Sequence, residues 1–495
     1  MNTKQGLKQI LIHQLPAWIL LFCVFQPVLD VIGYWQQKLG WTNLPTLLVR
    51  MVFLGWMVLM GFFLSEKKRL YLIFGGVAAL YLAGHVAACL QAGSEYHWIE
   101  DLLDQIRTLY LPLTALCFVT FLRRNPESWS ALQKSLVVNF GLILLVMLLS
   151  AVTGTDPHFY ETKNLGVRGW FIWKSPQSAI LCMLVPMVIA WAERRFDGRR
   201  IPLAGVSLIC FTTLFLAGTR LAFFCIAATG FGWLLLTLLF RRKKLRQALV
   251  ILLCAVLLLA LFPLSPMSRN QKEISKNIVI KQDRINAAAG VSPGTETTDD
   301  TEALAAAYRY NLQGLIDRFG IETVAHYYHN TLSARKIFEN RIMRIAYCHL
   351  LMEQTAEKAP LARWFGLEIG QMHRTTEVYD FYSDSFRTDQ QTFDPENDLH
   401  GVYYLCGIVG LLLLIAVLLT AAVRLALYLL YSRQPLTAEL TGLAIAYGAG
   451  LLYAFETNST LRRNNASVYL GLVIAAIWYL CGRTENDGRK MEEPT

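Results

Sequence analysis

The sequence is poor in charged residues. Only 17% of its 495 residues are Asp, Glu, Lys or Arg, while 54% are hydrophobic, and the mean hydropathy is +0.38. Soluble globular domains carry about 25% charged residues. Apolar runs of about 18 or more residues, enough to cross a hydrocarbon core of about 30 Å, recur from one end of the chain to the other. The low charge therefore argues against a soluble domain and predicts a polytopic membrane protein.

Several motifs are absent as well. The sequence has no glycine-rich phosphate loop, which argues against an ATP-driven machine or a nucleotide-sugar enzyme. It has no convincing internal repeat, which weakens an inverted-repeat transporter. The first apolar run, 11–35, lacks a small-residue cleavage site, so we expect a retained helix there and not a signal peptide. Nine of the ten cysteines lie in or beside the apolar runs. The tenth, Cys348, lies alone in the predicted outer loop and has no partner there for an intramolecular disulfide, so the sequence implies no disulfide framework.

The apolar runs predict twelve transmembrane helices. If the N-terminus is cytoplasmic, the short inner loops hold 17 Lys and Arg and the short outer loops hold six, a bias that places both termini inside at the plasma membrane. The sequence pI near 9.0 then reflects inner loops that face anionic headgroups, and not nucleic-acid binding. The predicted spans are 11–35, 46–64, 70–91, 105–122, 135–153, 173–192, 201–217, 221–240, 248–264, 401–423, 437–455 and 467–482.

The spans divide the chain into three predicted regions: a bundle of helices one to nine (1–264), an extracytoplasmic loop domain (265–400), and helices ten to twelve with a cytoplasmic tail (401–495). The loop carries 15 Lys and Arg against 19 Asp and Glu. Two stretches of it, EALAAAYRYNLQGLIDRF and TLSARKIFENRIMRIAYCHLLMEQTAEKA, have helical spacing. Its last part, 366–394, is rich in Asp, Ser and Thr, which predicts irregular structure. We therefore expect an all-α membrane protein with one large, mostly helical outer loop.

Three arginines stand at or near the predicted outer surface. Arg220 follows one span and precedes another in LAGTRLAFFC, Arg168 lies between two glycines in GVRGWF, and Arg341 lies on the second loop helix. Each has an ordinary interpretation, as a snorkelling anchor or a solvated charge. Each also has a functional one, because the guanidinium is permanently charged and binds phosphoryl oxygens through a planar fork.

An acidic stretch, DPENDLH, precedes the tenth predicted span. It contains Asp394, Glu396, Asp398 and His400, and His400 follows Glu396 by four residues, about one helical turn. One carboxylate or the asparagine would serve as a helix cap. A cap does not account for all three carboxylates. Desolvation and like charge raise carboxyl pKa values toward those useful in a general base, and a histidine titrates in that range without help.

These segments resemble, in their order and placement, the O-antigen ligase and polymerase family of membrane proteins. The resemblance covers about residues 150–425 and is carried by GTR at a tight outer turn, by ENRIMRIAYCHLLME before GLEIG, and by ENDLHGVYYLCGIVG running into a helix. Members transfer a glycan from a polyprenyl-pyrophosphate carrier to an acceptor hydroxyl at the outer membrane face, without a metal or other cofactor. They are similar to the multi-pass (GT-C-like) class of lipid-donor glycosyltransferases.

The resemblance implies roles for particular residues. Arg220, Arg341 and Arg168 match family arginines and would bind the donor pyrophosphate. Many relatives have a His-Asn pair eleven residues before the first glycine of a G-x-x-G helix start. Counting back from Gly407 places Glu396 at the histidine position, followed by Asn397.

This departure leaves two candidate bases. Glu396 fits the alignment and keeps an E-x-D spacing with Asp398, which some relatives share. His400 is four residues later, on the same face of a helix. The expected partners are a polyprenyl-pyrophosphate-linked glycan, a glycan or lipid-glycan acceptor, and membrane lipids, with no nucleic acid.

Two other functions stay open at this stage: a transporter or flippase for a lipid-linked or anionic substrate, and a scaffold whose loop binds a wall polymer. A transporter needs charged residues within the spans, which are few here. Two buried polar residues within spans, Asp30 and His85, are expected either to be paired in the bundle or to line a cavity.

Overall fold

The computed structural model describes a chain built almost entirely of helices. It describes residues 3–42, 44–93, 96–157, 166–272, 275–276, 315, 318–320, 322–324, 326–327, 340–368, 370, 373–380, 385–392, 395, 397–432, 435–457 and 460–492. Within these residues eleven helices are long and apolar enough to cross a membrane. The chain is a multi-pass membrane protein, as its hydropathy predicts.

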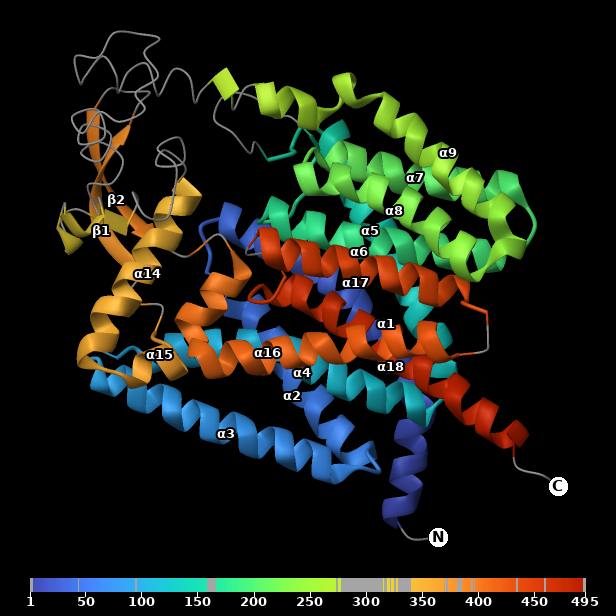
Figure 1. The fold of residues 1–495 in the computed structure, drawn as a ribbon, viewed down its shortest axis with the longest axis horizontal. Helices are drawn as coiled ribbons and strands as arrows, with labels where there is room; N and C mark the ends of the chain where they lie inside the picture. Colours follow the sequence, from blue (N-terminus) through green and yellow to red (C-terminus); the bar gives the residue numbers. More distant parts are fainter. Residues whose placement is uncertain are drawn as a thin grey trace. The chain divides into compact units, whose positions relative to one another are not determined.

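The eleven helices coincide with eleven of the twelve predicted spans (Figure 1). The twelfth, 248–264, corresponds to α9 (Leu245–Ala260) and a short 3-10 turn, Phe262–Leu264. The 16 residues of α9 extend about 24 Å, less than a hydrocarbon core of about 30 Å, so a crossing by α9 remains a prediction. The eleven are α1 (Thr3–Lys38), α2 (Leu44–Leu64), α3 (Lys68–Gln91), α4 (Trp98–Arg124), α5 (Glu127–Val152), α6 (Lys174–Arg195), α7 (Arg200–Ala217), α8 (Arg220–Phe240), α16 (Asp398–Tyr431), α17 (Ala438–Glu456) and α18 (Asn464–Glu492).

Contacts group the chain into two compact units. The first contains residues 1–76, 107–269 and 414–495, and the second contains residues 77–106 and 270–413. The second unit therefore combines most of the predicted outer loop with the end of α3, the start of α4 and the start of α16. The division into regions 1–264, 265–400 and 401–495 remains a prediction about membrane topology.

Helix α6 is the core of the first unit. It packs against α5, α7, α8, α17 and α18, and 83% of its most apolar window is buried (Figure 1). A helix that is apolar on all faces is expected to be surrounded in this way. The α17 backbone approaches α6 closely, because a Cβ on Gly442 would lie 2.6 Å from the carbonyl oxygen of Pro186. Small residues permit this kind of close packing between membrane helices.

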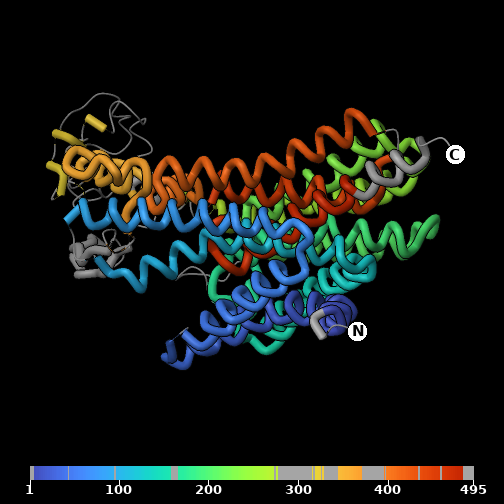
Figure 2. Tube along the Cα trace, turned by 90° about the horizontal axis from the view of Figure 1, so that it is seen from below, coloured from blue at the N-terminus to red at the C-terminus, as the bar shows by residue number. Residues whose placement is uncertain are grey.

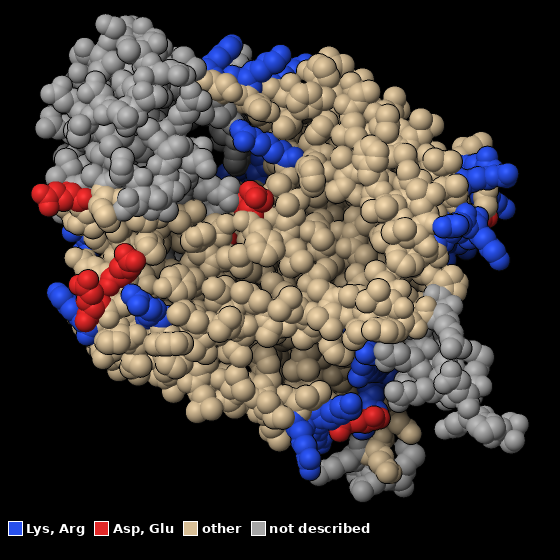
Figure 3. Space-filling view, in the orientation of Figure 1, with Lys and Arg blue, Asp and Glu red and all other residues tan. Residues whose placement is uncertain are grey.

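The outer helices of the first unit expose large apolar side chains. Val52 is 71% exposed and Ile201 is 87% exposed. The face drawn in Figure 3 has a broad area without charged side chains between clusters of Lys and Arg. Exposed apolar area of this extent is suited to contact with lipid.

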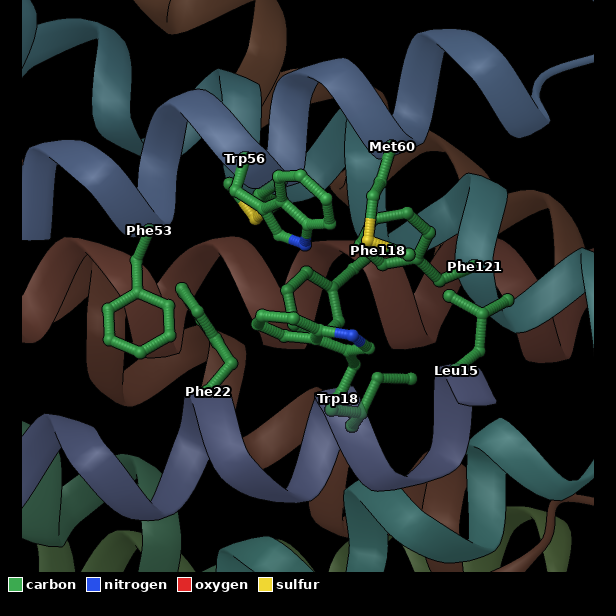
Figure 4. Close-up of a pocket in the computed structure, with 10 residues that line it drawn as sticks. Leu15, Trp18, Phe22, Phe53, Trp56, Met60, Phe118 and Phe121 are labelled. Atoms are coloured by element: carbon green, nitrogen blue, oxygen red, sulfur yellow. The ribbon is translucent and has the colours of Figure 1, made fainter. Parts of the chain in front are cut away.

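Aromatic residues of α1, α2 and α4, among them Trp18, Trp56 and Phe118, surround a small apolar pocket (Figure 4).

Ion pairs with little solvent exposure lie within the first unit. Arg50 donates to the carboxylate of Asp30 at 2.6 Å, and the amide of Asn465 donates to the same carboxylate at 3.4 Å. At the other end of α6, Glu193 accepts from Arg241 and from the indole of Trp233. Asp30 is thus paired within the bundle, one of the two roles expected for it.

The second unit contains the described part of the outer loop. Helix α14 (Asn340–Lys358) confirms the second predicted loop helix, and the short α15 (Leu361–Phe365) follows it. Most of the first predicted loop helix lies outside the described residues. Figure 2 shows the end of α3 beside the start of α16, and here a Cβ on Gly410 would lie 3.2 Å from the ring of Tyr81.

The prediction of irregular structure over 366–394 is wrong. This segment forms an antiparallel hairpin of β1 (His373–Asp380) and β2 (Ser385–Thr392), in which His373 pairs with Thr392 and Asp380 with Ser385. Its Asp and Ser residues favour turns, whereas its Thr, Val, Tyr and Phe residues favour a strand. The expected all-α fold therefore needs one correction: the described part of the chain is nearly all-helical and includes one hairpin.

Helix α16 is bent at Gly407. This residue has φ 64° and ψ −171°, so that two helical segments, 398–406 and 408–431, meet there. Helix α15 packs directly onto the bend: a Cβ on Gly407 would lie 2.3 Å from the carbonyl of Trp364, and one on Gly366 would lie 2.3 Å from the carbonyl oxygen of Leu405. Only glycine fits a positive φ and so close a backbone contact.

Candidate functional site

The segment that carries Arg168 is held by a half-buried carboxylate. Asp156, just after α5, accepts hydrogen bonds from the backbone N–H groups of Arg168 at 3.1 Å and Gly169 at 2.6 Å, and from the hydroxyl of Ser150 at 3.0 Å. The indole of Trp170 donates to Thr155 at 2.9 Å. These bonds fix the backbone on both sides of Arg168, so the position from which its side chain leaves is preformed.

Removal of the Asp156 carboxylate is expected to destabilise this segment. Asp156→Ala leaves two backbone N–H groups without their acceptor, which should cost about 2 kcal/mol and lower the apparent Tm in detergent. Asp156→Asn keeps one acceptor oxygen and should lower the Tm less. Equal Tm values for the wild type and Asp156→Ala would contradict this role for the carboxylate.

The same segment packs against the turn between α7 and α8. The N–H of Val167 donates to the carbonyl of Leu216 at 2.8 Å, and a Cβ on Gly166 would lie 2.9 Å from that oxygen. Gly218 ends α7 with φ 67°, and Thr219 caps α8 by accepting from the N–H of Ala222. Arg220 is the first residue of α8 and is exposed. The structure thus places Arg168 and Arg220, two of the three predicted pyrophosphate ligands, on adjoining segments of one unit.

Hydroxyl groups of α6 and α17 hold the turn between α7 and α8 in place. The Ser178 hydroxyl of α6 lies 2.6 Å from that of Thr219 and 2.6 Å from that of Tyr453 on α17. Ser178 and Tyr453 are buried. The turn before Arg220 is therefore held by α6 and α17 and by the segment that carries Arg168.

The side chain of Arg168 is half-buried. Burial lowers the pKa of its guanidinium, while Tyr34 and Asp156 act in the opposite direction. An arginine still keeps its charge at neutral pH. Among the described residues, no group hydrogen-bonds its buried Nε. A charged group with a buried, unused donor is suited to binding an anion.

Further cations lie on the segments around Arg168. Lys174, the first residue of α6, is buried and lies near enough to Arg168 and Asp156 to interact electrostatically with both. Arg463, which precedes α18, stacks over the ring of Trp173 at 5.3 Å. The N-termini of α6 and α8 add partial positive charge. We call Arg168, Lys174, Arg220 and Arg463 the cationic cluster.

Sequence reasoning missed two members of the cationic cluster. The pyrophosphate ligands predicted from the sequence do not include Lys174 or Arg463. The pair Arg462-Arg463 in a predicted outer loop runs against the positive-inside bias. This exception to the positive-inside bias is the sequence signal that could have identified Arg463 as a candidate.

The remaining predicted site residues belong to the second unit. Arg341 lies in the first turn of α14, and Asp398 is the first residue of α16 and is buried. His400 is exposed. Asn397 caps α16, since its side-chain oxygen accepts from the N–H groups of Leu399 at 3.0 Å and His400 at 3.1 Å. The cap of α16 is thus an asparagine.

The structure tests the predicted site only in part. Glu396 and Asp394 lie outside the described residues. Arg168 and Arg220 are brought together in the first unit, and Asp398 and His400 lie within one turn of each other in the second. It remains a prediction that the arginines of the first unit and the site residues of the second unit act together on one diphosphate.

Comparison with known proteins identifies the family. A search of curated proteins finds no match to the chain. A family model described as "O-antigen ligase like membrane protein" matches residues 13–480, and so includes every predicted site residue. Because this match covers most of the chain, the protein belongs to the O-antigen ligase-like membrane protein family.

Proposed function

We propose that the protein is a glycosyltransferase-type enzyme that transfers a glycan from a polyprenyl-pyrophosphate carrier to an acceptor hydroxyl at the outer face of the membrane. The reaction class, ligation or polymerisation of a cell-surface glycan, follows from the family. The observation that supports the donor is the cationic cluster, in which Arg168 offers a buried guanidinium donor beside the exposed Arg220.

The cationic cluster would act on the leaving group. In the transfer step the bond between the anomeric carbon and the pyrophosphate oxygen breaks, and its electron pair leaves with the pyrophosphate. Arg168 and Arg220, joined by Arg341 from α14, would stabilise the negative charge that develops there. Since the carrier bond supplies the driving force, the step takes no ATP. The arginines would take the role of a metal ion at the leaving group, so the proposed reaction is metal-independent.

The acidic stretch before α16 would supply the base. The acceptor hydroxyl attacks the anomeric carbon from the face opposite the pyrophosphate, so a single displacement inverts that carbon. Glu396, or His400 in its place, would accept the hydroxyl proton, and Asp398 would raise the proton affinity of Glu396 through like charge. The reaction requires both termini to be cytoplasmic and residues 265–400 to be extracytoplasmic.

Separate substitutions distinguish the two bases. With purified protein in nanodiscs and a lipid-pyrophosphate oligosaccharide, we expect Glu396→Gln to slow glycan transfer by at least about 100-fold, the lower end of a general-base contribution. His400→Ala should then retain most of the activity. The opposite result assigns the base to His400, and wild-type rates in both variants would exclude both residues.

The same donor also tests the alternative function. In proteoliposomes a transporter would move the lipid-linked glycan across the bilayer without forming a new glycosidic bond. We expect new bonds and free carrier pyrophosphate. Translocation without either product would replace the transferase proposal.

A further inference from the structure

A second cluster of polar side chains is buried in the second unit, separate from the residues proposed for transfer. His85 and Cys89 lie one turn apart on α3, and Asp101 lies near the start of α4; they are 0%, 0% and 2% exposed. The Nε2 atom of His85 lies 3.0 and 3.1 Å from the two carboxylate oxygens of Asp101 and 3.6 Å from the Sγ atom of Cys89. His85 is thus paired within its unit, and three electron-rich atoms meet at one point.

The contact made by Nδ1 of His85 shows which nitrogen of the ring carries a proton. Nδ1 lies 2.6 Å from the backbone carbonyl of Phe365, which can only accept a hydrogen bond. Nδ1 therefore carries a proton. A neutral ring then presents a lone pair at Nε2, toward Asp101 and Cys89.

Gln105 supports a lone pair at Nε2. Its side-chain nitrogen donates to the carbonyl of Leu405 at 3.1 Å, and its side-chain oxygen accepts from the hydroxyl of Tyr81 at 3.0 Å, which fixes the orientation of the amide. The same nitrogen lies 3.1 Å from Nε2 of His85. A proton on Nε2 would meet this N–H donor, whereas a lone pair accepts from it.

The lone pair faces a buried carboxylate and a sulfur atom, which together make a set of possible metal ligands, and a metal ion there would take the place of the Gln105 N–H at Nε2. The three potential ligand atoms all lie within 4.8 Å of one another. In tetrahedral zinc sites, with Zn–N and Zn–O of about 2.0–2.2 Å and Zn–S of about 2.3 Å, ligand atoms are separated by about 3.2–3.7 Å. The separations from Nε2 to the carboxylate oxygens, 3.0 and 3.1 Å, and to Sγ, 3.6 Å, are close to these values.

The surroundings match those of bound metals. Metal-bound histidines commonly donate their second N–H to a carbonyl, and bound carboxylates commonly accept a further hydrogen bond. Here Nδ1 of His85 donates to Phe365, and the hydroxyl of Tyr96 donates to Asp101 at 2.8 Å. A thiolate and a carboxylate also neutralise a divalent ion, which removes the cost of a net charge in a buried site.

We propose that His85, Cys89 and Asp101 form a structural Zn²⁺ site. Binding would displace the thiol proton of Cys89 to solvent, and a water molecule would complete the coordination. The ion would join α3 to α4 and, through Phe365, fix α15, on which the bend of α16 rests. It takes no part in glycan transfer.

Metal analysis of the full-length protein tests this site. We expect about one zinc per chain in protein purified with Zn²⁺ and without chelator, measured by elemental mass spectrometry. Substitution by Co²⁺ should give a thiolate-to-cobalt charge-transfer band. Cys89→Ala should lose both signals. Cys210→Ala, which removes another buried cysteine from a membrane helix, should keep both.

Three results would overturn the proposal. They are a wild-type protein without stoichiometric zinc, a cobalt derivative without the thiolate band, and a Cys89→Ala variant that retains zinc and the band. The first two need no variant, so they hold even if Cys89→Ala fails to fold. Chelation should also lower the Tm of the wild type and of Cys210→Ala. None of these measurements depends on glycan transfer, so the zinc site and the proposed function can fail separately.

Discussion

Replacement of Gly407 by alanine is expected to unfold the second unit or to prevent its assembly. The substitution places a Cβ 2.3 Å from the backbone of Trp364 and imposes a φ of 64° on an L-residue. The positive φ alone costs about 1–2 kcal/mol. Because the neighbour is backbone, it cannot move aside as a side chain would. We expect a loss of more than about 4 kcal/mol, in the range of the most damaging substitutions.

Thermal unfolding and size-exclusion profiles in detergent measure this effect. Gly448→Ala is the matched control, because it lies in a membrane helix and a Cβ there meets no atom within 4 Å. The control should match the wild type or exceed it slightly, since alanine favours helix over glycine. Equal Tm values for Gly407→Ala and Gly448→Ala would show that the bend relaxes without cost.

Replacement of both Arg168 and Arg220, which lie on adjoining segments of the first unit, is expected to abolish glycan transfer. Arg168→Ala and Arg220→Ala should each lower kcat by at least about 100-fold, the loss typical of one electrostatic contact to a developing charge. The double variant should lie near the background rate. Arg→Lys changes keep the charge but lose the planar fork, so they should recover only part of the rate.

Two controls separate this loss from misfolding. Arg246→Ala removes an exposed arginine at the start of α9 and should transfer at the wild-type rate. All variants should elute and melt like the wild type, because the Arg168 segment is held by its backbone bonds to Asp156 and not by the arginine side chain. Full activity in the double variant would return both arginines to the role of membrane anchors.

Much of the fold follows from the sequence because membrane helices satisfy their backbone hydrogen bonds locally. Eleven of the predicted spans correspond to observed helices for this reason. The hairpin of 373–380 and 385–392 was missed because its polar composition resembles that of a loop. The bend at Gly407 was marked by the G-x-x-G pattern, but the helix packed onto it was not.

The candidate site was predictable where a residue type alone implies its chemistry. An arginine at a tight turn, such as Arg220, stands out because charge is costly there. The bonds of Asp156 to the Arg168 segment, and the approach of that segment to the end of α7, depend on tertiary contacts that no local pattern encodes. The contact between His85 and the carbonyl of Phe365 spans 280 positions, and so could not be inferred from spacing.

The burial of α6 has a consequence for how the protein responds to its bilayer. Peripheral helices adapt to a thicker or thinner membrane by tilting, at a modest cost for each ångström of mismatch. Helix α6 is enclosed by five other helices and has little surface through which lipid can act on it. Trp173 and Lys174, at its first turn, therefore keep their depth when the surrounding lipid changes, and acyl-chain length should alter transfer rates far less than charge at this end of the helix does.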